Sequence, residues 1–464
     1  MIDKSALSRG LAVAVSGLAC VGIQGGVAVA EQGAEPTLLG QVLENATYES
    51  KTVMTAFPRA VHQADSSGIE DEPVEAWTHL SLDSTTFLDD YWTFGLGLEA
   101  LASTYRGAER GAFSAPGVRK GHGRYVDLSR MTLSYLGDTV EVLAGKDAVP
   151  IGLAEIYSPT DLYGAENTAN PQQPVDYGVW QLRTDLYVGS DRLTGIILPI
   201  EESAPGPAEH SRWNGPNGSG GSDFANLNIT GLPVGISPEI VDDYRDSTPS
   251  NWSYLLQYKG TATNLDYFIT AYNGVGPYPV LKNPASGQFN PYTKVYPTVS
   301  IASAGSALVQ GSWKFYGEGL AYWAEEDTDD DFARALIGAK YRETQFANSI
   351  GWKEITPIIE YSKEWRFGLQ NHPDYNTSSK EARPNPNDVL MSLTVEANDE
   401  WKFGGMHGHS LQDWDSTSQV FARYQPNDNL WTMISFVEYH GNEGTQFGRY
   451  DRNDNISLTV NYTF

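Results

Sequence analysis

The chain has almost no cysteine, because Cys20 is the only one among its 464 residues. One thiol excludes a framework of internal disulfides. After residue 30 there is also no run of about 20 apolar residues, so no transmembrane helix is expected. Positive charge is scarce as well: 31 Lys and Arg stand against 58 Asp and Glu, for a formal net charge of −27. Such acidity argues against nucleic acid as a partner, because phosphate backbones are also anionic.

The first thirty residues have the pattern of a secretory signal peptide. Lys4 and Arg9 precede an apolar core, and the small residues that end at Ala30 offer a cleavage site. Cleavage there would remove Cys20 and leave a mature chain without a thiol. A lipoprotein signal at Cys20 is the weaker interpretation, because Gly17 stands where such signals usually have Leu. We therefore predict an exported protein.

Strand periodicity dominates the rest of the chain. Aromatic residues make up 12% of the sequence and there are 46 Gly, which is typical of β-sheet proteins with many loops. From residue 91 onward, apolar and polar residues alternate, so that each strand has one apolar and one polar face. Examples are WTFGLGLEA (92–100), RMTLSY (130–135), WQLRTDLYV (180–188), NLDYFI (264–269) and NISLTVNYTF (455–464). Lipid or a second protein layer must cover the apolar face.

The connections between these strands alternate between short and long. Short stretches rich in turn residues lie at 136–138, 189–191, 261–264, 397–400 and 425–429. Long polar segments lie at 106–123, 147–178, 201–250, 273–293, 325–331, 362–387, 411–416 and 440–453. Short turns at one end and long loops at the other are typical of a transmembrane β-barrel. We predict an all-β, antiparallel barrel of 16 strands, with 18 as the alternative, that has short periplasmic turns and long extracellular loops.

A soluble β-sandwich is the competing architecture, since its strands also alternate. The Trp, Tyr and Phe residues near the strand ends and the long connections favour the barrel, whose outer face carries aromatic girdles. The predicted organisation is a signal peptide at 1–30, a periplasmic N-terminal segment at 31–90 and the transmembrane barrel at 91–464. Within the N-terminal segment, residues 76–82 are a candidate extra strand and residues 37–57 a candidate short helix.

The last ten residues place apolar side chains at alternate positions and end on Phe464, with Tyr462 two residues before it. This end resembles the signal by which outer-membrane β-barrels of Gram-negative bacteria are recognised for assembly. The resemblance implies a location in the cell outer membrane, with outer-membrane lipids, lipopolysaccharide and the barrel-assembly machinery as partners. A closed barrel also lets the chain end here, because the last strand pairs with the first and leaves no open edge.

A second resemblance covers residues 124–281. The stretches RMTLSYLGDTVEVLAGKDAVPIG, YSPTDLYG and WSYLLQYKG are similar to porin-like barrels, in which a strand hairpin leads into a loop with a Pro-x-Asp element, here Pro159 and Asp161. This resemblance implies a channel for small-molecule solutes and does not name the solute. By analogy with porins, a homotrimer is expected.

If the apolar face of each strand meets lipid, the opposite face lines the lumen. The basic residues on that face are Arg130, Arg183, Lys259, Lys314, Arg334, Lys340, Arg342, Lys402 and Arg423. The acidic ones are Glu99, Glu141, Asp185, Asp266, Glu318, Glu360 and Glu396. Opposed charges in a narrow pore predict a transverse field that orients polar solutes. The plainer interpretation is that these charges only pair with one another and with water.

The segment 147–178 is the candidate constriction loop. It follows a strand directly, contains several prolines that stiffen it, and carries Pro159, Asp161, Tyr163 and Glu166. Folded inward, it would narrow the pore. The alternative is an ordinary external loop.

Two further motifs are candidate cation sites. EEDTDDD (325–331) could bind calcium or magnesium through its oxygens, but it lacks the spacing of a calcium loop, and a solvated acidic loop is favoured. His407 and His409 have a spacing that can ligate a transition metal. They lie on the face of Trp401, at the outer rim, without an evident third ligand, so neither a metal nor a cofactor is predicted.

These observations favour a passive outer-membrane channel for small polar or amphiphilic solutes. A barrel hydrolase is the rival hypothesis, in which His372 with Asp374, or His440 with Glu438, would activate a nucleophile. No Ser-centred motif accompanies these pairs, and an enzyme is therefore not predicted. A structural or adhesive barrel with a blocked lumen is the third hypothesis, and it differs from a channel only in conductance.

Overall fold

Eighteen long antiparallel strands close into one barrel in the computed structural model of the chain. The structure describes residues 37–59, 72–104, 111–112, 124–168, 172–201, 206, 212–214, 240–243, 245–286, 288, 291–376, 383–442 and 445–464. In order around the wall, the strands are β1 (Ala46–Ala56), β2 (Val74–Phe87), β3 (Trp92–Ser103), β5 (Arg124–Leu136), β6 (Val140–Asp147), β9 (Val179–Val188), β10 (Asp191–Leu198), β12 (Ser253–Ala262), β13 (Leu265–Val275), β16 (Thr298–Gln310), β17 (Trp313–Ala324), β18 (Asp331–Tyr341), β19 (Glu354–Gly368), β21 (Asn387–Glu396), β22 (Trp401–Ser410), β23 (Ser416–Tyr424), β24 (Leu430–His440) and β25 (Asn455–Thr463).

The barrel closes because the last strand pairs with the first. In the register between β1 and β25, Val53 lies opposite Thr459, and the amide of Phe464 donates to the carbonyl of Tyr48 at 2.8 Å. Every barrel strand therefore has two neighbours, and no edge strand is left to aggregate or to face lipid unpaired. The predicted antiparallel barrel is confirmed, with the alternative count of 18 strands rather than 16.

The two additional strands lie in the segment that was predicted to precede the barrel. β1 and β2 pair with each other and complete the wall, so the barrel begins at Ala46 and the predicted boundary at residue 91 is wrong. Their alternation is reversed in part: Val53 and Trp77 pack in an apolar cluster inside, while Thr52 and Thr78 bond to each other on the outer face at 3.0 Å. With this weak contrast, β1 lies within the segment expected as a helix (37–57), of which only Leu38–Glu44 is helical, whereas the candidate strand at 76–82 lies within β2.

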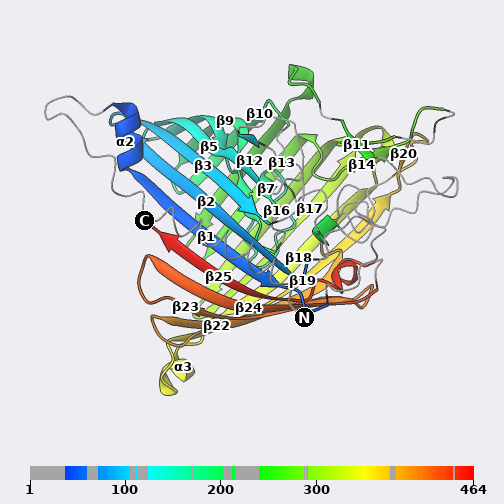
Figure 1. The fold of residues 1–464 in the computed structure, drawn as a ribbon. Helices are drawn as coiled ribbons and strands as arrows, with labels where there is room; N and C mark the ends of the chain where they lie inside the picture. The colour runs from blue at the N-terminus through cyan, green and yellow to red at the C-terminus, as the bar shows by residue number, and fades with distance from the viewer. Residues whose placement is uncertain are drawn as a thin grey trace.

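Small elements lie before the first barrel strand and in the connections between the barrel strands. They are the helices α2 (Leu38–Glu44) and α3 (Gln345–Ser349), the short strands β4 (Gly111–Ala112), β7 (Ala165–Asn167), β8 (Val175–Tyr177), β11 (Ile240–Asp242), β14 (Val280–Lys282), β15 (Tyr292–Val295) and β20 (Tyr375–Asn376), and the 3-10 turns η3 (Arg212–Asn214), η5 (Pro249–Asn251), η6 (Glu325–Asp327) and η8 (Gly448–Tyr450). α2, α3 and the C-terminus lie toward the left end in Figure 1, and β11, β14 and β20 lie at the opposite side.

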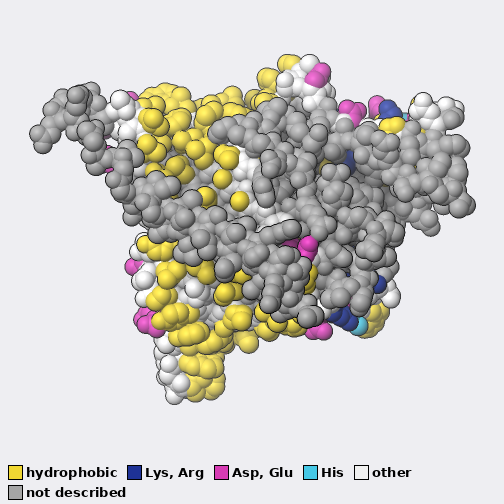
Figure 2. Space-filling view, viewed as in Figure 1, with side chains coloured by type: hydrophobic (Ala, Val, Ile, Leu, Met, Phe, Trp, Pro, Cys, Tyr) yellow, Lys and Arg dark blue, Asp and Glu magenta, His cyan; other side chains and the backbone are white. Residues whose placement is uncertain are grey.

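Neighbouring residues in register share a face, so the pairing assigns each side chain to the outside or the inside. The outward positions carry large exposed apolar side chains, such as Leu182, Leu256, Ile269 and Ile337. Hydrophobic side chains gather over the strands at the left of Figure 2. Within the part of the chain that the structure describes, no helix is long and apolar enough to span a membrane.

Packing inside the barrel is concentrated on one side. A cluster that includes Tyr163, Phe268, Tyr272, Leu320 and Tyr322 joins the inner faces of β13, β16 and β17 to the segment between β6 and β9. This segment and the wall that it contacts form the candidate functional site.

Candidate functional site

The segment 148–178, which connects β6 to β9, folds into the barrel and contacts strands on the far side of the wall. The amide of Leu153 donates to Glu318 of β17 at 2.8 Å. At its other end, Asn167 donates to Glu99 of β3 at 2.9 Å and to the hydroxyl of Tyr125 at 2.6 Å. We call residues 148–178 the inner loop. Of the two alternatives, the contacts match the inward fold.

Glu360 of β19 anchors the middle of the inner loop. Its carboxylate accepts the amides of Glu155, Ile156 and Tyr157 at 2.8, 2.9 and 3.0 Å. The hydroxyl of Tyr316 donates to the same carboxylate at 2.6 Å. Glu360 is almost fully buried, so charge-assisted bonds from four donors replace the water that an ionised carboxylate requires.

Two lysines of the wall hold the same turn of the inner loop. Lys314 of β17 and Lys340 of β18 contact Glu155 at 2.6 and 2.9 Å, and Lys314 also donates to the carbonyl of Leu153 at 2.9 Å. Burial opposes ionisation of Glu155, but the bonds from both lysines outweigh it and set its pKa below the ordinary value. The turn is thus tied to three adjacent strands, because Glu360 adds β19.

The returning part of the inner loop carries the residues that the sequence singled out. Pro159 is buried, and Tyr163 packs against Tyr272 with ring centroids 4.9 Å apart. Asp161, Glu166 and Asp176 lie around a cavity of about 30 Å³. Burial raises the pKa of Asp161 to about 6, against a bond from the Ile151 amide, and the neighbouring carboxylates raise it further. Burial also raises the pKa of Glu166, and the nearby carboxylate of Asp176 raises it further.

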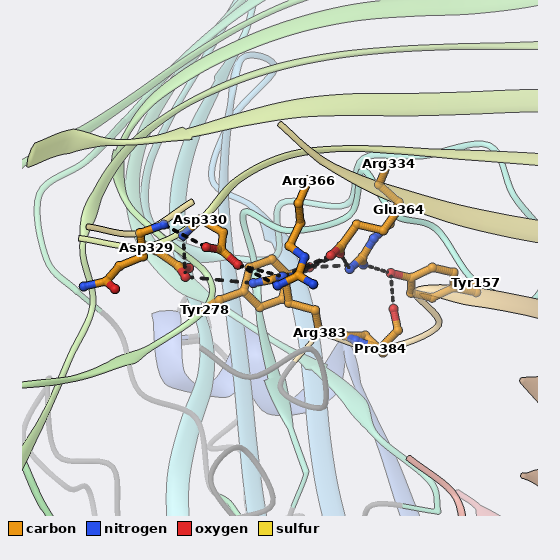
Figure 3. A network of polar contacts seen from close by, with 10 residues as sticks. Tyr157, Tyr278, Asp329, Asp330, Arg334, Glu364, Arg366, Arg383 and Pro384 are labelled. Atoms are coloured by element: carbon orange, nitrogen blue, oxygen red, sulfur yellow. Dashed lines mark hydrogen bonds and ion pairs between the residues drawn. The ribbon is translucent and has the colours of Figure 1, made fainter. Parts of the chain in front are cut away.

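A second network fastens the tip of the inner loop to several other segments (Figure 3). Arg334 of β18 donates to Glu364 of β19 at 2.5 Å and to the hydroxyl of Tyr157, which in turn donates to the carbonyl of Pro384 at 3.2 Å. Arg383 donates to Glu364 at 3.0 Å. The side chains of Arg334 and Arg383 are fully buried. Arg334 was expected to line the pore, but this burial leaves it no contact with a passing solute.

The acidic loop at 325–331 supplies carboxylates to the same network. Asp329 and Asp330 are almost fully buried, and Asp330 pairs with Arg366 at 3.2 Å and lies 4.0 Å from Arg383. In Figure 3, Arg383 lies between these two aspartates and Glu364. The expected solvated loop is therefore wrong for these positions. The role of Arg383 in this network is not predictable from the sequence, because its partners come from separate segments of the chain.

The remaining charges that were predicted to line the lumen mostly occur in ion pairs or hydrogen bonds. Arg130 bonds Asp83 at 2.8 Å, Arg183 bonds Asp185 at 3.1 Å, and Lys402 bonds Glu396 at 2.5 Å. Glu141 accepts from Tyr187 at 2.9 Å, and Glu99 contacts His79 at 3.2 Å. Lys259 lies opposite Arg192 and Asp266 opposite Thr261, which places both on the inner face. Arg342 follows the end of β18, is 68% exposed and pairs with Glu354, so it does not line the wall.

The inner face of β22, β23 and β24 has a different character. Arg423 lies over the ring of Trp431, 4.6 Å from its centroid, and donates to Gln425 at 2.7 Å. Phe421 covers Gly404, where a Cβ atom would lie 2.5 Å from the ring. Among the described residues, no carboxylate lies within ion-pair distance of Arg423, whose guanidinium lies beside Trp431 and Gln425 and opposite Lys402 on the inner face. We call Lys402, Phe421, Arg423 and Trp431 the open wall.

The long loop between β10 and β12 also reaches into the barrel. Arg212 of η3 bonds Glu75 of β2 at 2.7 Å, and both side chains are buried. The ring of Trp213 packs edge-on against the rings of Phe57 and Tyr439, with centroids 6.2 and 6.1 Å apart. Nothing in the sequence predicted this contact. Its signal in the sequence is the Arg212-Trp213 pair, and the Gly-rich centre of that loop lies outside the described residues.

The histidines considered for metal or catalysis lie on other surfaces. His407 and His409 face outward, with their rings stacked 6.2 Å apart, and His407 bonds Ser418 at 2.8 Å. Across the described ranges, no group of three or more His, Cys, Asp or Glu residues is arranged to hold a metal. The Nδ1 atom of His372 accepts the backbone amide of Asp374 at 3.3 Å. His440 lies opposite Ser416, and Glu438 opposite Ser418, in the register of β24 with β23.

Comparisons with known proteins give no family. No family model matches the chain, and no curated protein matches it. Among solved structures, OccK8 (OprE) of Pseudomonas aeruginosa has a TM-score of 0.48 at 9% identity, over 90% of this chain and 97% of that chain. A triple-mutant porin of Rhodopseudomonas blastica has a TM-score of 0.39 at 10% identity, over 90% and 99% of the two chains. A loop-deletion mutant of OmpT, an outer membrane protein of Vibrio cholerae, has a TM-score of 0.39 at 9% identity, over 90% and 98%.

These likenesses concern the course of the strands and carry no argument about a solute. What defines the class is the chain's own geometry: a closed barrel with an apolar outer face, a charged inner face and a loop folded inside. This is the architecture of a transmembrane β-barrel.

Proposed function

We propose that the protein is an outer-membrane channel through which small polar or amphiphilic solutes diffuse passively, without catalysis. The observation that carries this proposal is the inner loop, which Glu360 and two lysines hold against the far wall while the open wall keeps its charges toward the lumen. A loop fixed inside a closed barrel narrows the passage and sets which solutes fit. Asp161, Glu166 and Asp176 would then face cations, and Arg423 with Lys402 would face anions.

The outer-membrane location and the orientation are part of this proposal. The exposed apolar side chains of the outer face support a lipid environment, since contact between so many apolar side chains and water is unfavourable. The signal-peptide pattern and the C-terminal Tyr462 and Phe464, whose rings contact each other at 4.6 Å, support export and assembly. A trimer stays an expectation by analogy with porins.

Single-channel recording tests the proposed function. The refolded mature protein is inserted into a planar bilayer, and current steps and the reversal potential under a salt gradient are measured. Stable steps are expected. Silence in the bilayer, with the protein folded, would instead favour a barrel with a blocked lumen, and lipase or protease activity in the same preparation would favour the hydrolase. A mature chain that stays folded and monodisperse without detergent would remove the membrane placement itself.

A further inference from the structure

Three polar side chains lie in one row on the inner face of the wall. Ser362 of β19 lies opposite Asp388, the second residue of β21, and Asp388 lies opposite Ser410, the last residue of β22. Directly opposite residues of adjacent antiparallel strands have Cβ atoms about 4.5–5.5 Å apart. The carboxylate of Asp388 therefore has a serine on each side, at the end of the barrel that carries the long connections.

The turn that follows β22 adds a second carboxylate to this row. The amide of Ser410 donates to the carbonyl of Asp415 at 2.9 Å, so the turn closes back on the end of the strand. The charges of Asp415 and Asp413 both act on the carboxylate of Asp388, and that of Asp415 acts more strongly. The hydroxyl of Ser410 also lies close to this carboxylate, without the geometry of a hydrogen bond. We call Ser362, Asp388, Ser410 and Asp415 the buried oxygen cluster.

Most side-chain oxygens of the cluster are buried without partners. Ser362, Asp388 and Asp415 are completely buried, and Ser410 is 2% exposed. Within the part of the chain that the structure describes, neither oxygen of Asp388 accepts a hydrogen bond, and Oδ1 of Asp415 and Oγ of Ser362 also lack a partner. The strongest charges that act on Asp388 are both negative. Two buried carboxylates in such surroundings are strongly unfavourable unless a positive charge compensates them.

Backbone contacts hold Asp415 in place from the other side. Its Oδ2 atom accepts the amides of Phe447 and Gly448 at 2.5 and 3.3 Å. A Cβ atom at Gly441, whose φ is 149°, would lie 2.5 Å from the Cβ of Asp415, so the connection between β24 and β25 lies directly against this residue. The two amides fix one oxygen of the carboxylate, which leaves Oδ1 as the oxygen available to a ligand.

We infer that the buried oxygen cluster binds one calcium ion. Its side-chain ligand atoms are all oxygens, which suit a hard cation, and its two carboxylates match a divalent charge. Calcium takes about six to eight oxygens in flexible geometry and accepts backbone carbonyls among them, whereas magnesium usually keeps several waters. Burial of the cluster leaves little room for such waters and therefore favours calcium.

Neutral oxygens complete this site, because only two of its side chains are carboxylates. It thus differs from a group of three or more acidic residues, of which the described residues contain none arranged for a metal. The ion would join β19, β21 and β22 to the connection between β24 and β25, which already holds Asp415. The inference goes beyond the proposed function, since a barrel without conductance would hold the ion equally well.

Calcium titration of the refolded mature barrel in detergent tests the inference. Protein that has been treated with EDTA and transferred to chelator-free buffer near neutral pH is titrated with CaCl₂ alone, by isothermal titration calorimetry. One ion per chain is expected, with a dissociation constant on the order of 10⁻⁴ M, as in extracellular calcium modules. CaCl₂ should also raise the temperature of heat-dependent unfolding, because only the folded chain assembles the site. MgCl₂ at the same concentration should raise it less.

Asp388→Asn removes one of the two carboxylates. It should bind calcium at least about tenfold more weakly than wild type, and CaCl₂ should no longer raise its unfolding temperature. Glu326→Gln is the control, because Glu326 is an exposed carboxylate of the acidic segment 325–331. It should bind calcium as tightly as wild type, which distinguishes the buried cluster from cation binding at the acidic segment.

A proton shared between the two carboxylates is the alternative way to remove their repulsion, and it needs no metal. Wild type that binds no calcium would support the shared proton and overturn the inference. Equal affinities of wild type and Asp388→Asn, or a loss of binding in Glu326→Gln, would also overturn it. Ser362→Ala provides the test if Asp388→Asn does not fold: it keeps both carboxylates and should still weaken calcium binding, and unchanged affinity would reject the site.

Discussion

Two parts of the inner wall use charge in opposite ways. On β17, β18 and β19, the inward charged side chains are paired, some of them fully buried, and they hold the inner loop and its neighbours: Glu360 alone accepts three backbone amides. On β22 and β23, Lys402 pairs with one carboxylate and Arg423 with none among the described residues. The comparison shows that facing inward does not define a pore-lining residue. A charge contacts solute only where the fold has not already satisfied it.

The largest expected effect is release of the inner loop by Glu360→Gln. The neutral amide accepts more weakly from the three loop amides and places a donor near them, so the loop should detach and the conductance should rise. We expect single-channel steps that are larger and noisier than those of wild type. Glu396→Gln, on the open-wall side of the barrel, is the control. An unchanged conductance in Glu360→Gln would show that the loop does not restrict the passage.

Arg383→Met should weaken the barrel more than it changes transport. It leaves Asp329 and Glu364 buried with less compensation, which in proteins destabilises by about 3–5 kcal/mol. A lower temperature of heat-dependent unfolding in detergent, read by gel mobility, checks this. Arg366→Met, at a side chain that is half exposed, is the matched control and should shift the transition little. Equal shifts in the two variants would mean that burial of the network is not what gives it strength.

Arg423→Gln tests the open wall. Removal of a guanidinium that no carboxylate neutralises should shift the reversal potential toward cation selectivity, while the folding temperature stays near that of wild type. Arg183→Gln is the control from a paired inward position, since Asp185 and Asp147 accompany it. A larger shift in selectivity for Arg183→Gln than for Arg423→Gln would contradict the distinction between satisfied and available charges.

The smallest expected effect is a pH dependence from the inner loop. The pKa of Asp161 is about 6 in the folded chain and lower in the unfolded chain. Stability therefore falls as pH rises toward 6, because only the folded state still holds the proton. Above pH 6 the carboxylate is ionised and attracts cations, so cation selectivity should decrease when pH is lowered from 7 to 5. Asp161→Asn should remove this change, and Asp138→Asn, in a short turn, should not. A wild-type reversal potential that is the same at both values would exclude titration of this loop.

Much of the wall follows from the sequence. Alternation placed Lys314, Lys340, Glu318 and Glu360 on the inner face, where the structure has them, because a pleated strand sends successive side chains to opposite sides. The same rule failed at β1 and β2, where Val53 and Trp77 are buried inside and threonines pair outside. Alternation in the sequence shows only that the two faces of a strand differ in polarity. Where apolar side chains also pack inside the barrel, the two faces become similar and the pattern is weak.

The role of each inward side chain could not be predicted in this way. Glu155 and Glu360 are separated by 205 residues and meet only because the inner loop crosses the closed barrel. The same holds for Arg383, which lies beside Glu364 after an excursion of the chain through β20. No local pattern encodes such meetings, since they depend on how far a loop reaches and on which strands face each other.

By itself, the sequence determined that this chain forms strands with one apolar and one polar face, and that its last ten residues form one of them. These features are local, because side-chain polarity and the two-residue repeat of a strand decide them. The tertiary structure alone decided the number of strands, the inward course of residues 148–178 and the difference between Arg334, which is buried in ion pairs, and Arg423, which is open to the lumen. Closure of the barrel brings together charged residues that are far apart in the sequence. The partners that each charge then acquires decide whether it holds the fold together or faces the lumen.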